Sequence, residues 1–303
     1  MEFEELNECT LCPRNCKVNR NEEKNGFCRA GKNVKVALCS LHYYEEPSIS
    51  GEAGSGTVFF TGCNLRCVFC QNYRVSQELE GKEITIEELA NEFLNLQEKG
   101  ANNINLVTGF MYVPHIIEAL KIAKEKGLKV PVVYNSSGYE STETLKLLDG
   151  FVDVYLPDLK YYYDDLGKKF SGVDNYFEKA TEAIYEMYRQ VGSPEFDENG
   201  MIKRGLIIRH LVLPNNIDNS KKVLKWIKDN INDDVYVSVM AQYFPTHKAK
   251  DNKELKLDRK ISKEEYDEIE NYVFELDLNG YMQDYDEGDE SKYVPNFEQN
   301  TNK

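Results

Sequence analysis

Three cysteines stand close together in the segment TGCNLRCVFCQN, at Cys63, Cys67 and Cys70. Thiolates at such short spacings are typical of metal ligation, and closed zinc sites and closed iron–sulfur clusters take four protein ligands. Three thiolates can hold three irons of a [4Fe–4S] cube and leave the fourth iron without a protein ligand. The spacing therefore predicts an iron–sulfur cluster that is open to an exogenous molecule at one corner.

Four further cysteines near the N-terminus, Cys9, Cys12, Cys16 and Cys28, supply a complete set of ligands. The set is compatible with structural zinc, with a rubredoxin-like iron or with an auxiliary [4Fe–4S] cluster. A segment of about thirty residues has too little core to order itself, so a bound metal would stabilise it. We expect a structural or electron-relay metal site here, and we expect the remaining Cys39 to be a small buried side chain.

The composition limits the class of protein. The chain has 303 residues, of which 41% are hydrophobic, enough for one large α/β domain and a small appendage. Its net charge of −15 argues against nucleic acid as the main partner. The clustering of all cysteines within residues 9–70, without an apolar signal segment or a membrane-length apolar run, favours metal ligation over disulfides and predicts a cytoplasmic protein with no membrane partner.

Short apolar runs alternate with amphipathic stretches along the middle of the chain, and these elements must position the cysteines. Strands are expected at 57–62, 103–108, 131–136, 151–157, 205–213 and 234–240, and helices at 85–100, 113–127, 139–149, 174–191, 218–231 and 262–279. Successive strand–helix units predict a parallel sheet with ligands at the carboxyl ends of its strands. Because six units are too few for an eight-stranded barrel, we expect an α/β fold with a partial (β/α)6 TIM-like barrel. A flat doubly wound sheet is the alternative.

The chain divides into three predicted zones. Residues 1–50 form a small Cys-rich metal-binding segment, residues 51–282 form the partial barrel, and residues 283–303 form an acidic surface tail. Glu45 and Glu46, in the loop before the first expected barrel strand, are expected to be solvent-facing or structural, because acidic loop residues are common in so acidic a chain.

The three-cysteine segment, with the aromatic Phe69 before its last cysteine, resembles the signature of radical S-adenosylmethionine (SAM) enzymes. The stretches CTLCPRNC, EEPSISGEAGSGTVFFTGC and IIRHLVLP are similar to the pyruvate formate-lyase-activating-enzyme-like branch, in particular to homologues with an N-terminal Cys-rich segment. The resemblance implies that Cys63, Cys67 and Cys70 are catalytic and that SAM binds the open iron. It also implies that an electron from the cluster releases a 5′-deoxyadenosyl radical, which abstracts hydrogen from a substrate.

The resemblance assigns SAM contacts to the ends of the second and third expected barrel strands. Thr108 and Gly109 match the backbone that meets the SAM amino group in the family. A Gly-Gly-Glu run is absent, and residues 109–111 stand where close relatives have a Pro-Thr-His-like stretch. Asn135 and Ser137, with Ser136 between them, offer short polar groups after the third strand, and a turn or helix N-cap is their alternative role.

Charged candidates follow in later strands. Asp158 and Lys160 resemble an Asp-Leu-Lys motif of activating enzymes and lie on the same side of an extended segment, where Lys160 can neutralise the SAM carboxylate. An ordinary ion pair is the alternative. Arg209 lies within an apolar strand and is predicted to bind an anion or a carboxylate, whereas its neighbour His210 is expected to be a satisfied core residue. Gln242 occupies the slot that contacts adenosine in related enzymes.

By resemblance, the predicted function is that of a radical SAM oxidoreductase of the glycyl-radical-activating kind. Such an enzyme abstracts hydrogen from a glycine of a partner protein and receives electrons from flavodoxin or ferredoxin. The alternatives are radical modification of another peptide or of a small metabolite, and a non-catalytic iron–sulfur electron carrier. Lys160 and Arg209 weigh against the carrier, because an electron carrier has no need to bind SAM. We therefore expect a protein or peptide substrate and no nucleic-acid partner.

Overall fold

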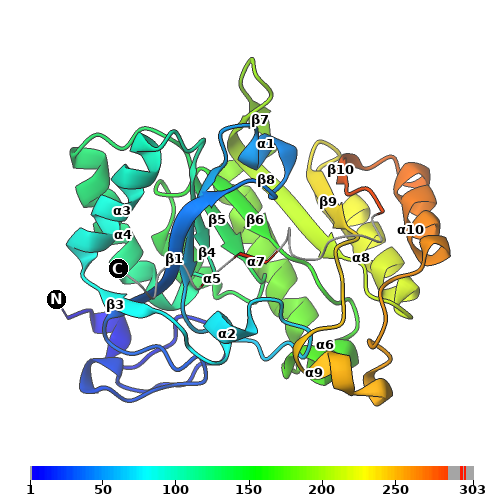
Figure 1. Cartoon of the computed structure of the whole chain (residues 1–303), viewed down its shortest axis with the longest axis horizontal. Coiled ribbons are helices and arrows are strands. Elements are labelled where there is room, and N and C mark those ends of the chain that lie inside the picture. Colours follow the sequence, from blue (N-terminus) through cyan, green and yellow to red (C-terminus); the bar gives the residue numbers. More distant parts are fainter. Residues whose placement is uncertain (1, 286–293, 296, 298–303) are drawn as a thin grey trace.

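One continuous sheet, in the order β10-β9-β8-β6-β5-β4-β2-β1-β3, runs through the protein (Figure 1). The structure is a computed structural model that describes residues 2–285, 294, 295 and 297. The strands are β1 (Val34–His42), β2 (Ser55–Phe60), β3 (Lys82–Ile84), β4 (Ile104–Val107), β5 (Val132–Ser136), β6 (Val154–Pro157), β8 (Ile202–Leu211), β9 (Tyr236–Met240) and β10 (Asn279–Met282), with β7 (Glu195–Phe196) paired to β8. Within these described ranges, no helix is long and apolar enough to cross a membrane.

The predicted strands are all present, as β2, β4, β5, β6, β8 and β9, and neighbouring members of this series pair in parallel. Their order in the sheet follows their order in the chain, without the reversal that defines a doubly wound sheet. The flat alternative is therefore excluded, and the partial barrel is confirmed. In the described part of the chain, β10 and β3 end the strand order, so the barrel is open between them.

The strands β1, β3, β7 and β10 were not predicted. β1 pairs antiparallel with β2, in a register that places His42 opposite Ser55, and β10 extends the parallel series beside β9. β1 belongs to the predicted segment 1–50, so the predicted boundary at residue 50 falls between two paired strands. The N-terminal segment thus contributes directly to the sheet that carries the candidate site.

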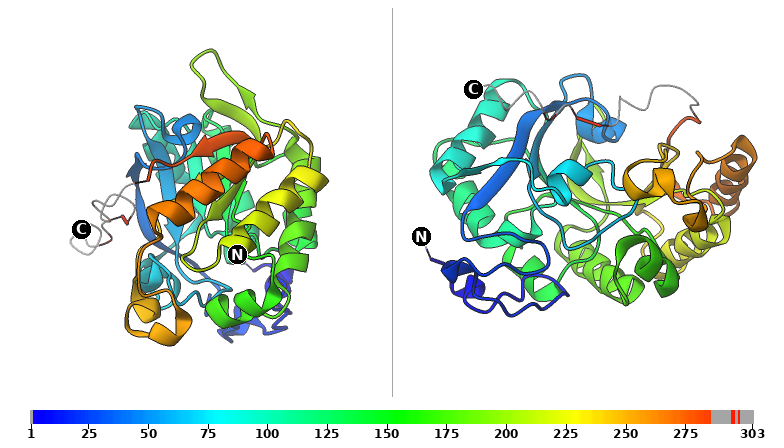
Figure 2. Two further views of the ribbon diagram at one scale, coloured as in Figure 1. Left: turned by 90° about the vertical axis from the view of Figure 1, so that its right-hand side faces the viewer. Right: turned by 60° about the horizontal axis from the view of Figure 1, so that its bottom comes forward.

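Helices follow the outer side of the sheet (Figure 2). The longer ones are α3 (Ile86–Glu98), α4 (Val113–Glu125), α6 (Asp164–Ser171), α7 (Tyr176–Val191), α8 (Ile217–Asn230) and α10 (Lys263–Glu275), and the shorter ones are α1 (Pro47–Ser50), α2 (Tyr73–Ser76), α5 (Thr142–Leu147) and α9 (His247–Asp251). The apolar stripes of α3 and α4 pack into the main core. The Thr85–Glu88 capping box fixes the start of α3. Among the longer helices, α6 was not predicted.

The short helix α1 fills the amino end of the barrel, opposite the end where α2, α6 and α9 lie (Figure 1). Ile49 is fully buried against apolar side chains of β5, β6 and β8, including Val133, Val154 and Ile207. The side-chain amide of Asn103 donates to the Ile49 carbonyl oxygen at 2.7 Å. This anchoring carries the residues just before α1 into the interior of the barrel.

Most of the predicted tail 283–303 lies outside the described residues. Phe297, which is described, is 7% exposed and meets the ring of Phe59 edge-on at a centroid distance of 5.4 Å. It shares a small apolar cluster with Leu38 and Val75, and Pro295 lines the neighbouring cavity. Part of the predicted surface tail is thus packed against the mouth of the barrel.

Candidate functional site

A cavity of ≈220 Å³ opens at the carboxyl ends of the parallel strands. Its walls contain the predicted site residues Cys63, Cys67, Cys70, Thr108, Asn135, Ser137, Asp158, Lys160, Arg209 and Gln242. Gly109 does not line it. The structure thus gathers side chains from the ends of several strands around one space, while their roles toward SAM stay predictions.

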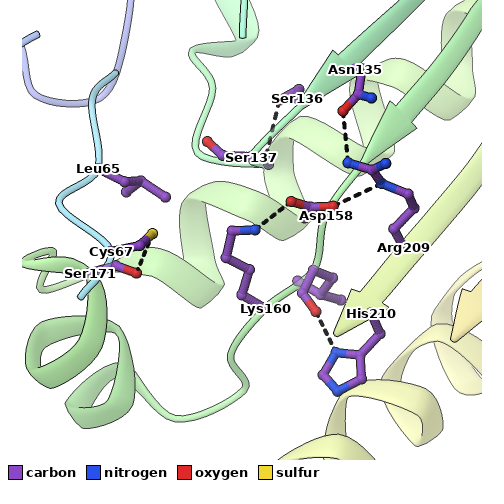
Figure 3. Close-up of polar contacts among 12 residues, drawn as sticks. Leu65, Cys67, Asn135, Ser136, Ser137, Asp158, Lys160, Ser171, Arg209 and His210 are labelled. Carbon is purple, nitrogen blue, oxygen red and sulfur yellow. Dashed lines mark hydrogen bonds and ion pairs between the residues drawn. The ribbon is translucent and has the colours of Figure 1, made fainter. Parts of the chain in front are cut away.

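The cysteine loop that follows β2 is anchored to the end of α6. The backbone N–H of Arg66 donates to the carbonyl oxygen of Ser171 at 3.0 Å, and that of Val68 donates to Phe170 at 2.8 Å. Cys67 lies between the two anchored residues and faces the cavity (Figure 3). These two hydrogen bonds therefore hold the backbone of the loop in place.

Each of the three sulfur atoms has a short hydrogen-bond partner from the protein. Such contacts stabilise thiolates and help to set the reduction potential of an iron–sulfur cluster. The contacts are Leu65 N–H to Cys63 Sγ at 3.4 Å, Ser171 Oγ with Cys67 Sγ at 3.0 Å and Ser76 Oγ with Cys70 Sγ at 3.2 Å.

The chemistry of these donors fits a cationic metal cluster. Burial, and then the neighbouring Cys67, raises the pKa of Cys70 to about 11, and burial likewise raises the pKa of Cys63 and of Cys67. Buried thiols of this kind stay neutral unless a nearby cation favours their thiolate form. Among the residues that the structure describes, no three His, Cys, Asp or Glu side chains already stand together as a metal site. The fit therefore rests on the donor types and their shared cavity.

Paired charges line the same cavity as the cysteines (Figure 3). Arg209 donates from Nε to Asp158 Oδ1 at 2.9 Å, from one terminal nitrogen to Glu45 Oε2 at 3.1 Å and from the other to Asn135 Oδ1 at 2.7 Å. Lys160 pairs with the second oxygen of Asp158. The prediction that Arg209 binds carboxylates is confirmed, and both cations are paired within the protein.

Two cations, Arg209 and Lys160, face three carboxyl groups in this network, those of Asp158, Glu45 and Glu46. Burial opposes ionisation of Asp158, but Arg209 and Lys160 outweigh it and lower the pKa of the carboxyl group. Burial raises the pKa of Glu45 and of Glu46, and Arg209 offsets only part of that rise. The network therefore combines an ionised Asp158, paired with Arg209 and Lys160, with the carboxyl groups of Glu45 and Glu46. These two groups keep their protons more readily than exposed carboxyl groups do.

Of the two roles expected for Glu45 and Glu46, solvent-facing or structural, the solvent-facing one is wrong. The side chain of Glu45 is 10% exposed and lines the cavity, and Glu46 is 7% exposed as a residue. Both immediately precede α1, which fills the amino end of the barrel, so the loop delivers the Glu45 carboxyl group to Arg209 from that end. One feature of the sequence indicated the burial of acidic side chains, namely that Arg209 lies in an apolar strand. A buried arginine needs acidic partners.

Thr108 and Gly109, two neighbouring predicted SAM contacts at the end of β4, face different parts of the protein. Thr108 lines the cavity with φ +57°, an uncommon conformation for a β-branched residue, and its N–H donates to the Asn135 carbonyl oxygen at 2.9 Å. Gly109 instead packs against α4, where an added Cβ would lie 2.7 Å from Ile116 Cδ1. Its glycine is thus explained by packing. Ser137 Oγ is buried without a hydrogen-bond partner among the described residues, so it is available to a ligand.

His210 lies outside the site, as expected. Its Nδ1 is 2.7 Å from the Leu159 carbonyl oxygen and its Nε2 is 2.8 Å from Ser220 Oγ, so both ring nitrogens are satisfied in the core (Figure 3). Burial lowers the pKa of His210 to about 4.

A partial parallel barrel that presents three cysteines and a paired-charge cavity at its carboxyl end is the arrangement of a barrel enzyme built around an iron–sulfur cluster. Residues 57–227 match the family model described as the radical SAM superfamily. This match covers more than half of the chain, and the chain belongs to the radical SAM superfamily. Membership implies a [4Fe–4S] cluster and SAM as cofactors.

Similar proteins agree with this assignment. The chain is 35% identical over 270 residues to an uncharacterized protein of Methanocaldococcus jannaschii, a match that covers 86% of this chain and 72% of the relative. It is 27% identical over 255 residues to the pyruvate formate-lyase-activating enzyme of Clostridium pasteurianum, with 80% and 99% covered. These relatives are consistent with the predicted activating-enzyme-like branch.

Among solved structures, SuiB of Streptococcus suis, bound to its precursor peptide SuiA, is similar in fold. The match has a TM-score of 0.50 and 12% identity, and it covers 73% of this chain and 46% of that one. The match thus spans less than half of SuiB, and it supports the partial barrel alone.

Substituting Arg209 with methionine should strongly destabilise the protein. The change leaves the buried carboxylates of Asp158 and Glu45 without their shared cation, so we expect Arg209→Met to lower the free energy of unfolding by about 3–5 kcal/mol in urea denaturation. Arg259→Met, which removes an exposed pair with Glu265, is the matched control and should cost clearly less. Equal losses in the two variants would contradict a buried, interdependent network.

His210 should contribute to the loss of stability in acid. Its pKa is about 4 in the fold against an ordinary value of 6.5, so the unfolded chain binds a proton in this interval that the folded chain does not. Stability therefore falls as the pH drops from 6.5 toward 4, by about 1.4 kcal/mol per pH unit from this group. In urea denaturation, the free energy of unfolding of His210→Gln should fall less steeply between pH 6.5 and 4 than that of the wild type, by this amount. Equal slopes for the two proteins would refute the assignment.

Proposed function

We propose that Cys63, Cys67 and Cys70 hold a [4Fe–4S] cluster whose open iron binds SAM, and that the protein uses the pair for hydrogen abstraction. When bound, the cluster supplies an electron and SAM supplies the adenosyl group, which together yield a 5′-deoxyadenosyl radical. The observation that carries this proposal is the convergence of three cysteines and a paired-charge network on one cavity. Family membership supports the same chemistry.

The charged residues suit the amino-acid part of SAM, which carries an ammonium and a carboxylate group. Lys160 and Asp158 place opposite charges side by side on the cavity wall, and a zwitterion matches such a pair. Ser137 offers a hydroxyl group that has no hydrogen-bond partner in the described part of the chain. Thr108, Asn135, Arg209 and Gln242 complete the proposed contacts, with Arg209 acting chiefly by orienting Asp158. The predicted contact of Gly109 has to be made by its backbone, because the residue does not line the cavity.

The cavity walls can protect a radical from water. Phe59 and Phe69 line the space beside the cysteines, and Val107 and Leu211 add apolar surface at the strand ends. Because water and oxygen would quench a reactive radical, an enclosed apolar wall favours transfer to the intended substrate.

We further propose a protein or peptide substrate, as in a glycyl-radical-enzyme activase. The chain aligns with nearly the full length of a pyruvate formate-lyase-activating enzyme. Tyr43 and Tyr44 are 52% and 53% exposed. Tyr44 also lines the cavity, together with His42. Exposed aromatic side chains at the rim of a cavity are typical contacts for a partner chain.

Other predictions remain proposals. They are a second metal site at Cys9, Cys12, Cys16 and Cys28, a flavodoxin or ferredoxin as electron donor, the three-zone division at residues 50 and 282, and a cytoplasmic location.

The proposal predicts reductive SAM cleavage. Anaerobically reconstituted protein with dithionite and SAM should release 5′-deoxyadenosine, and Cys67→Ala should release none, because the variant cannot complete the cluster. Cys39→Ala is the matched control, since Cys39 lies on β1 outside the cavity and should leave cleavage intact. Liquid chromatography with mass detection measures the product.

An electron carrier would give a different outcome, namely an intact cluster without SAM cleavage and without any SAM-dependent change in its EPR spectrum. The substrate class is tested in the same assay. A partner protein with a deuterated glycine should transfer deuterium into 5′-deoxyadenosine, and transfer only from a small metabolite would overturn the activase assignment.

A further inference from the structure

We propose that the four N-terminal cysteines hold a redox-active [4Fe–4S] cluster and that Asn64 connects it to the catalytic cysteine loop, so that electrons enter through the N-terminal site. This inference rests on the proposed SAM cleavage, which consumes one electron from the catalytic cluster.

The four cysteines gather around one small cavity. Its lining includes Cys9, Cys12, Cys16 and Cys28. Backbone hydrogen bonds of Cys9 and Lys17, Cys9 N–H to Val18 O and Lys17 N–H to Cys9 O, both at 3.0 Å, close the loop that carries the first three. Asn15 and Lys17 turn this loop with positive φ angles of 47° and 54°. The chain thus bends back so that all four cysteines line the same small cavity.

One of these sulfurs receives a backbone N–H group, as one does in the catalytic loop. Phe27 N–H donates to Cys16 Sγ at 3.4 Å, and Leu65 N–H donates to Cys63 Sγ at the same distance. Groups of N–H donors around sulfur stabilise thiolates and tune cluster potentials.

Asn64 contacts both cysteine loops. It is fully buried, its Oδ1 lies 3.9 Å from Cys63 Sγ, and its backbone carbonyl oxygen accepts from Arg14, two residues after Cys12. Its amide donates to the Tyr139 carbonyl oxygen at 2.7 Å, which fixes the side chain between the two loops. A single buried residue therefore bridges the proposed centres.

The two loops are also in direct backbone contact. Gly62, next to the first catalytic cysteine, has φ +100°, and an added Cβ would lie 2.8 Å from the Cys28 carbonyl oxygen. Only glycine permits so close an approach at this position. The packing therefore places the backbone of Cys28 directly against the residue that precedes Cys63.

Two arginines hold the loops together. Arg14 donates to the Asn64 carbonyl oxygen at 2.9 Å, and Arg66 donates to the Cys63 carbonyl oxygen at 2.8 Å and to that of Phe27. Both guanidinium groups lie over the Phe27 ring, at 3.8 and 4.3 Å from its centroid. They add positive charge beside sites that become more negative when they are reduced.

The geometry favours electron transfer over a purely structural zinc. Zinc has no accessible redox change. A zinc ion that only stabilised the N-terminal segment would not need to lie next to the catalytic loop. In the proposed step, an external flavin or iron–sulfur protein gives one electron to the N-terminal cluster, taking it from the 2+ to the 1+ state. That electron then passes to the catalytic cluster, which undergoes the same change, and no proton or other reactant is required.

Metal content tests the cluster itself. In full-length protein prepared anaerobically, we expect about eight irons and no zinc in the wild type, and about four irons in Cys12→Ala/Cys16→Ala. We also expect about four in a variant with Cys63, Cys67 and Cys70 all changed to alanine, whose dithionite-reduced EPR signal should not respond to SAM. Zinc, or no metal, in this last variant would overturn the proposal.

Reductant dependence tests the connection. Relative to wild type, Asn64→Leu and Cys12→Ala/Cys16→Ala should slow flavodoxin-driven SAM cleavage about tenfold more than dithionite-driven cleavage, because dithionite can reach the catalytic cavity directly. Cys39→Ala is the control. An unchanged ratio of the two rates in both variants would overturn the relay. Failure of dithionite-driven cleavage in the wild type would instead remove the proposed function, so the two failures are distinguishable.

Discussion

The attachment of the cysteine loop to the end of α6 is the constraint on which the rest of the site depends. Two backbone hydrogen bonds from Arg66 and Val68 hold the loop, and the same end of α6 supplies the Ser171 hydroxyl group beside Cys67. The three thiols line the cavity inside the barrel. A cluster held in this way would present its open corner to the cavity and not to solvent.

The cavity is completed from both ends of the barrel. The cysteine loop covers the carboxyl end, while α1 fills the amino end and brings Glu45 to Arg209. The result is a partly open cavity that paired charges and buried sulfur atoms line together. Polar groups that are ordered in advance in this way need little reorganisation when a charged cofactor binds.

The parallel strands and most of the site could be predicted, because runs such as PVVYNS are apolar on both faces and polar residues follow them. β1 could not, because VKVALCSLH mixes polar and apolar residues and its pairing with β2 is not local. α6 was missed because DDLGKKFS contains Gly167 and few apolar residues. The burial of Glu45 depends on the packing of α1 into the barrel end, which no local pattern reveals.

The most direct test of the account is electron–nuclear double resonance of the reduced protein with SAM labelled at its carboxylate oxygens and amino nitrogen. The account predicts magnetic coupling from both labelled groups to a [4Fe–4S] cluster, and loss of that coupling in Cys67→Ala. A cluster that shows no coupling to either label, or one whose fourth iron is permanently bound by a protein side chain, would contradict it.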